Sequence, residues 1–216
     1  MASGEQDKQI HRDEVDSDDE NHIGNGYKAP QKMDIGSIVA KDGNDESLTR
    51  YKKLLLGDSS DGKQIHSQLV DPNDPRTVLP IRITLIFDNH KPDVVFELKG
   101  SLEQLRDLHS KRSVTIKEGE YYRTQLEYYV QRDIVTGLKL QSKVLKARTI
   151  TVDRSKYMIG SRAPSAEIQT YISDVEQAPS GVLSRGTFLV KSKLTDDDKH
   201  VYAEWEWNLV IGKDWQ

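Results

Sequence analysis

The amino-acid sequence predicts an all-β protein, an antiparallel β-sandwich preceded by a flexible N-terminal helical arm. Two observations carry this prediction. From residue 79 onward, apolar and polar side chains alternate with a period of two over eight or nine short segments separated by turn residues. Before that point the chain is polar and acidic, and its apolar side chains recur only at helical spacing.

The first 26 residues are expected to form an acidic tail. Hydrophobic residues make up 35% of the 216 residues, below the ~45–50% of an ordinary globular domain, and the deficit lies at the N-terminus. Residues 13–20 read DEVDSDDE. Such a segment buries too little apolar area to offset the conformational entropy lost on ordering. We therefore expect residues 1–26 to be disordered in isolation.

Residues 27–57 are expected to form the helical arm. Apolar side chains fall on one helical face at 34–40. A second helix is predicted for 46–56, because residues 44–47 offer N-cap candidates and Gly57 offers a stop. The apolar face of this helix–loop–helix rests either on its own domain or on the surface of a partner.

The linker and the sandwich follow the arm. Residues 58–76 are rich in Asp, Ser, Gly and Pro, which is typical of a linker. The sandwich is expected over 77–216, with one short helix at 101–108 whose Ser101 and Gln104 form a capping-box pattern. The strands are predicted at 79–88, 93–99, 113–117, 121–131, 137–145, 148–153, 168–173, 182–194 and 200–211.

Composition and motifs argue against several classes of function. The net charge of −4 and the absence of a long basic run do not favour nucleic-acid binding. The chain has no cysteine, which excludes disulfides and is compatible with the cytosol. No apolar run approaches the ~20 residues of a membrane span, and the polar, acidic N-terminus is unlike a signal peptide.

No catalytic or metal-binding constellation is evident in the sequence. The six histidines are scattered, with none paired at metal-ligand spacing, and neither a nucleophile elbow nor a phosphate-binding glycine loop is present. The acidic run 196–198 lacks the glycine and distal glutamate of an EF-hand loop, so we interpret it as a solvated hairpin turn. We therefore expect a protein that is not an enzyme and that needs no cofactor or metal.

Two tryptophans mark one face of the last predicted strand. Trp205 and Trp207 are two residues apart, so both point to the same side of the strand. They either fill the core of the sandwich, as aromatic side chains often do, or line an apolar pocket between two splayed sheets. Periodicity does not separate these two interpretations.

Five groups of residues together resemble the Rho GDP-dissociation inhibitor family, in order from about Tyr27 to Trp215. The resemblance implies an immunoglobulin-like sandwich behind a regulatory arm. The motifs are YKAP at 27–30, DESLTRYK at 45–52 with LLG at 55–57, YMIGS at 157–161, APSG at 178–181 with LSRG at 183–186, and TDDDK at 195–199 ahead of WEWNL at 205–209.

The resemblance implies a two-part grip on a prenylated Rho-family GTPase, of the Rho, Rac or Cdc42-like kinds. The arm would fold onto the switch regions of the GTPase and block GDP release. The sandwich would take up the geranylgeranyl group and so extract the GTPase from membranes into the cytosol. Contact with a membrane is then expected to be transient and through the client only.

The resemblance also assigns roles to particular residues. The GTPase-binding candidates it implies are Asp45, Tyr51, Leu55, Leu56 and Asp198. The prenyl-binding candidates are Leu85, Val114, Leu183, Val190, Trp205 and Trp207. The family often has Phe at the position of Val114 and Ile at that of Val190. Two loops also depart from the family pattern, at 101–112 and at 162–164.

Two other classes remain as alternatives. A general prenyl or acyl-lipid carrier of sandwich shape would lack GTPase specificity, and a switch-binding arm at 45–57 argues against it. An immunoglobulin-like adhesion domain is disfavoured by the absence of cysteine and by the acidic tail. The sequence does not indicate which Rho-family GTPases are preferred, or whether farnesyl or geranylgeranyl is favoured.

Overall fold

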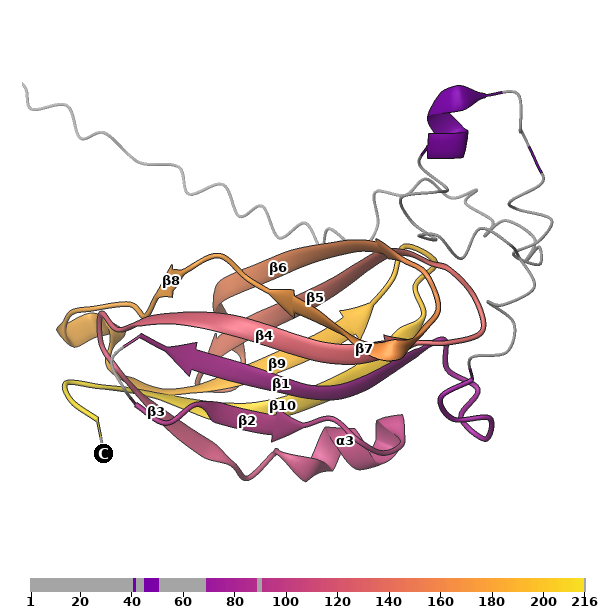
Figure 1. Cartoon of the computed structure of the whole chain (residues 1–216). Coiled ribbons are helices and arrows are strands. Elements are labelled where there is room, and N and C mark those ends of the chain that lie inside the picture. Colours follow the sequence, from indigo (N-terminus) through magenta and orange to yellow (C-terminus); the bar gives the residue numbers. More distant parts are fainter. Residues whose placement is uncertain (1–40, 42–44, 51–68, 89–90, 216) are drawn as a thin grey trace, which may run out of the picture. The chain divides into compact units, whose positions relative to one another are not determined.

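The computed structural model describes residues 41, 45–50, 69–88 and 91–215. The predicted tail at 1–26 and the first predicted helix of the arm, 34–40, lie outside this described part. Of the second predicted arm helix, residues 46–50 are described, and they are helical. From Val78 onward the chain forms two β-sheets packed face to face (Figure 1).

The first sheet, sheet A, has the strand order β2-β1-β4-β7, with the short strand β8 also paired to β4. All its described pairs are antiparallel. Its strands are β1 (Val78–Phe87), β2 (Val94–Glu97), β4 (Tyr121–Val130), β7 (Ser165–Ile172) and β8 (Glu176–Gln177).

The second sheet, sheet B, has the strand order β3-β10-β9-β5-β6. Its strands are β3 (Ser113–Lys117), β5 (Val135–Lys146), β6 (Ile150–Arg162), β9 (Gly186–Thr195) and β10 (Val201–Gly212). The pair β3 and β10 is parallel, and the other described pairs are antiparallel. The predicted all-β sandwich is therefore confirmed, with one parallel pair as a departure from a purely antiparallel pattern.

The core lies between the facing sides of the two sheets. The period-two pattern of β4 turns alternate side chains inward, so that Leu126, Tyr128 and Val130 are each 0% exposed. From sheet B, Leu138, Leu140 and the tryptophans of β10 meet them. Burial of such large apolar side chains stabilises the fold by about 1.5–3 kcal/mol each.

The short helix α3 (Leu102–Leu108) carries the chain from sheet A to sheet B (Figure 1). Its predicted capping box is present: the Ser101 hydroxyl accepts from the Gln104 amide at 3.3 Å, and the Gln104 side chain accepts from the Ser101 amide at 2.9 Å. Leu105 is fully buried and α3 lies against β10. The capping box thus fixes where the chain changes sheets.

Two predicted strands differ from those in the structure. The segment predicted as 148–153 continues to Arg162, because β5 offers a partner along its whole length and Gly160 allows the irregular register there. The segment predicted as 182–194 is broken, with a single 3₁₀ turn at Val182–Ser184 before β9 begins at Gly186. Gly181, at a φ of 100°, turns the chain out of the sheet at that point.

Candidate functional site

The predicted GTPase-binding residue Asp45 is the N-cap of the described helical segment 46–50. Its carboxylate accepts from the backbone amides of Ser47 at 2.9 Å and Leu48 at 3.1 Å, and from the Ser47 hydroxyl at 2.7 Å. A negative charge at this end also complements the helix dipole. Asp45 therefore has a local structural role as well as its predicted one. The other three arm candidates, Tyr51, Leu55 and Leu56, lie outside the described residues.

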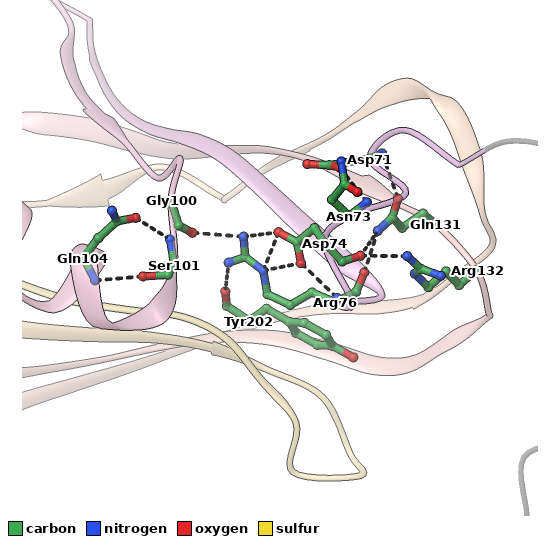
Figure 2. Close-up of polar contacts among 10 residues, drawn as sticks. All are labelled: Asp71, Asn73, Asp74, Arg76, Gly100, Ser101, Gln104, Gln131, Arg132 and Tyr202. Atoms are coloured by element: carbon green, nitrogen blue, oxygen red, sulfur yellow. Dashed lines mark hydrogen bonds and ion pairs between the residues drawn. The ribbon is translucent and has the colours of Figure 1, made fainter.

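The end of the predicted linker is fastened to the sandwich by two side chains from the β4–β5 turn (Figure 2). Gln131, which is 0% exposed, donates to the carbonyls of Asp74 and Arg76 at 2.9 Å each and accepts from the Asp71 amide at 3.0 Å. Arg132 donates to the Pro72 and Asp74 carbonyls at 2.9 Å. Residues 71–76 are therefore held against the sandwich.

Arg76 extends this anchor to the last strand. It forms an ion pair with Asp74 at 2.6 Å, and its hydrogen bonds hold the pKa of the Asp74 carboxyl below its usual value. It also donates to the backbone carbonyls of Tyr202 and Gly100 at 3.0 Å each (Figure 2). Sequence reasoning missed this anchor because the Asp- and Pro-rich composition of 71–76 resembles a flexible linker.

The acidic turn between β9 and β10 is joined to the same end of the sandwich through Tyr202. The Tyr202 hydroxyl donates to Asp196 at 2.6 Å, and burial together with this carboxylate raises the pKa of the phenol. Asp196 also accepts from the His200 amide at 2.9 Å, and it is only 3% exposed. The expectation of a solvated turn is therefore wrong for Asp196, because its carboxylate is the buried acceptor that shapes the turn.

Asp198 lies beside that buried carboxylate and is half-buried. Asp196, Asp198 and His200 each place one possible metal ligand atom within 4.8 Å of the others. However, Asp196 is already committed to hydrogen bonds with Tyr202 and His200. The turn that carries the predicted GTPase-binding Asp198 and the anchored segment 71–76 are thus both bonded to Tyr202, through Asp196 and through Arg76.

Five of the six predicted prenyl-binding residues lie in the core. Leu85, Val114, Val190, Trp205 and Trp207 are between 2% and 7% exposed. Trp207 contacts Phe96 with ring centroids 5.1 Å apart, so in this structure it fills the core. The indole Nε1 of Trp205 is buried and has no hydrogen-bond partner among the described residues.

The sixth, Leu183, is 92% exposed on the 3₁₀ turn, next to Val182 at 76%. Glu118 stabilises the turn: its carboxylate pairs with Arg185 at 2.5 Å and accepts a hydrogen bond from the Gly181 amide at 2.9 Å. The Arg185 hydrogen bond keeps the pKa of Glu118 below its usual value. Two adjacent apolar side chains are therefore exposed on a turn that an ion pair holds in place.

A polar contact that sequence reasoning missed joins the two sheets. Glu176, on β8 of sheet A, accepts from Tyr157 of sheet B at 2.5 Å and from Tyr122 of β4 at 3.2 Å. Burial raises the pKa of both phenols, and the nearby carboxylate adds to the effect. The three residues are far apart in the sequence, so no local pattern could bring them together. We call them the Glu176 tie.

The chain resembles known proteins over almost its whole length. The family described as RHO protein GDP dissociation inhibitor matches residues 10–214. Rho GDP-dissociation inhibitor 1 of Homo sapiens is 36% identical over 202 residues, covering 94% of this chain and 92% of the human protein.

Two further relatives agree with this match. A probable rho GDP-dissociation inhibitor of Caenorhabditis elegans is 41% identical, covering 87% of this chain and 92% of that protein. Rho GDP-dissociation inhibitor 3 of Homo sapiens is 38% identical, covering 88% and 79%. None of the described helices is long and apolar enough to cross a membrane. This chain therefore belongs to the RHO protein GDP dissociation inhibitor family.

Proposed function

We propose that this protein binds prenylated Rho-family GTPases, slows the release of GDP and carries the GTPase from the membrane into the cytosol. The proposal rests on membership of the family, whose match extends over residues 10–214. The arm residues would contact the switch regions, and the sandwich would take up the geranylgeranyl group. The protein acts as a regulator by binding, not by catalysis.

The lipid site is the most demanding part of this proposal. Burial of an acyl chain is worth ~0.8 kcal/mol per methylene, so a 20-carbon geranylgeranyl group gains on the order of 10 kcal/mol after allowance for its unsaturation. The apolar space between the sheets is lined by Leu85, Val190 and the two tryptophans, which fill it in the structure. Uptake of the lipid therefore requires these side chains to move apart.

The exposure of Leu183 supports a lipid entrance at the 3₁₀ turn that carries it. An exposed leucine gains about 1.5–3 kcal/mol when it is covered, and this one stands on a turn braced by Glu118. A prenyl group passing the turn would cover it. The turn thus serves as an apolar lip, and it explains why a predicted lipid contact is exposed when no lipid is bound.

Asp198 and the arm would meet the GTPase at the same end of the sandwich. Through Arg76 and Tyr202, the segment that follows the arm is bonded to the strand that follows Asp198 (Figure 2). A GTPase held by the arm would therefore lie within reach of the acidic turn, and a basic patch on it could pair with Asp198.

The proposal is tested with a prenylated Rho-type GTPase on vesicles, loaded with a fluorescent GDP. The protein should slow GDP release and move the GTPase into the supernatant. Leu183→Arg should reduce extraction at least tenfold, because it places a charge at an apolar entrance. Leu108→Arg is the matched control, since Leu108 is 54% exposed on α3. Extraction by both variants at the unmodified level would contradict the assignment of the lip.

The alternative of a general lipid carrier predicts a different result in the same assay. Removal of residues 1–60 should then leave both lipid uptake and nucleotide release unchanged. If the arm grips the GTPase, the shortened protein should lose its effect on GDP release while it still binds a prenylated peptide.

A further inference from the structure

The outward side of sheet B carries an array of cations. Lys143 of β5 lies opposite Arg154 of β6 and opposite Lys191 of β9. The neighbouring residues Ser142 and Ser192 are hydrogen bonded to each other at 2.9 Å on the inner side of the same sheet. Because successive side chains alternate between the two faces, Lys143, Arg154 and Lys191 all point outward. Three cations thus stand in one row across three strands.

A second row repeats the pattern two residues along. Lys156 of β6 and Lys193 of β9 lie on either side of Gln141 of β5. In the next row Lys139 lies opposite Met158, whose side chain is 52% exposed. The outward positions of β5, β6 and β9 hold no acidic residue over these rows. The array therefore extends in two dimensions.

Acidic side chains on this face lie at its margins, on β10 and in the β9–β10 turn, where Asp197 pairs with Lys139 at 2.9 Å. Glu206 pairs with Lys191 and Arg148 at 3.6 Å each, and Glu204 pairs with Arg106 at 2.9 Å. Four cations of the array make no ion pair with any residue that the structure describes. These are Lys143, Arg154, Lys156 and Lys193.

This arrangement is unfavourable within the protein alone. Like charges directly opposite each other on a sheet repel, and here they are concentrated on one face of a chain whose net charge is −4. A local field of this kind attracts a partner of the opposite charge. The repulsion would be relieved by an anionic surface laid against the face.

The geometry of the array favours a surface over a linear partner. Neighbouring strands are about 4.8 Å apart and outward side chains along a strand are about 7 Å apart, so the cations cover an area and not a line. An extended acidic peptide would meet one row at a time. An exposed apolar side chain accompanies the cations on β6: Met158, opposite Lys139, is 52% exposed. Basic and apolar side chains together are typical of contact with a lipid interface.

We infer that the outward face of strands β5, β6 and β9 docks directly on anionic lipid membranes. The inference rests on the proposed function for its purpose, since a protein that removes a GTPase from a membrane must first reach that membrane. It replaces the expectation that membrane contact is through the client only. The contact would raise the local concentration of the inhibitor where its clients lie.

Binding of the full-length chain to vesicles, without any GTPase, tests this inference separately from the proposed function. The probe is a vesicle of phosphatidylcholine with about one third phosphatidylserine, compared with phosphatidylcholine alone. We expect binding to the anionic vesicles only, falling as salt rises. Lys143→Gln, Arg154→Gln and Lys156→Gln together should weaken it by on the order of 100-fold, from roughly fivefold per cation.

The matched control removes the same charge elsewhere. Lys99, Lys111 and Lys213 are exposed and lie outside the three strands, and their combined change to Gln should leave vesicle binding within about twofold of the unmodified chain. Circular dichroism should show both variants folded. Equal weakening by the two triple variants, or equal binding to neutral and anionic vesicles, would overturn the inference.

One further outcome would assign the face to a different occupant. The acidic run 13–20 could itself cover the cations. In that case the unmodified chain would not bind anionic vesicles, and binding would appear only in the triple variant Asp16→Asn, Asp18→Asn and Asp19→Asn. That result would replace the membrane with the chain's own tail. Loss of vesicle binding together with normal extraction of a GTPase would leave the proposed function standing and remove this inference alone.

Discussion

Tyr157→Phe tests the Glu176 tie between the two sheets. The change removes one hydrogen bond to a carboxylate at 2.5 Å and leaves the packing of the ring in place. Hydrogen bonds to charged groups contribute about 1.5–3 kcal/mol. In a domain of about 150 residues this lowers the melting temperature by roughly 4–8 °C. Calorimetry at neutral pH measures the difference directly.

Tyr121→Phe is the matched control for this experiment. Tyr121 is 48% exposed and precedes Tyr122 on the same strand. Its change should shift the melting temperature by about 2 °C or less, as surface substitutions do. If the two variants melt together, the hydroxyl of Tyr157 does not stabilise the fold, and the account of Glu176 as a tie between sheets is refuted.

Four other results are expected. Stability should fall as pH rises above about 10, since the folded protein keeps its buried phenols protonated while the unfolded chain ionises them. Urea melts at pH 8 and pH 11 measure this loss of stability. Tyr157→Phe should make the loss smaller, because it removes one of the buried phenols. Gln131→Leu should cost about 1–3 kcal/mol, because it leaves partly buried backbone groups unpaired, and amide exchange over 71–76 should quicken. Gly137→Ala should destabilise the acidic turn, since the added Cβ would overlap the Asp197 carboxylate at a φ of 59°. Asp198→Ala should speed dissociation from a GTPase about tenfold with little dependence on salt, and stopped-flow kinetics would show an unchanged rate if Asp198 makes no contact.

Local patterns were enough to predict most of the sandwich. The alternation in β1, β4 and β10 and the capping box before α3 depend on residues near one another in the sequence, so they are readable from it. The irregular parts depend on partners far away. The extension of β6 to Arg162 needs β5 beside it, and no periodicity shows that in advance.

The candidate site divides in the same way. Trp205 and Trp207 share a face, as their spacing predicts, and Asp45 caps a helix, as its position predicts. The burial of Asp196 and the exposure of Leu183 were not predictable, because each depends on a side chain from another element, Tyr202 and Glu118 respectively. Residue type alone suggested the reverse in both cases, an exposed aspartate and a buried leucine.

The parallel pair of β3 and β10 has a consequence for how the chain folds as it is synthesised. Among the described strands, β3 pairs only with β10 in sheet B, with Ser113 opposite Asn208, so it has no partner strand until β10 has been synthesised. Until then the inner side of β9 and the facing side of sheet A lack the tryptophans that cover them. Contacts of such long sequence separation form slowly, and apolar surface exposed in the meantime favours aggregation. A nascent chain of this protein is therefore expected to depend on protection by chaperones until β10 leaves the ribosome.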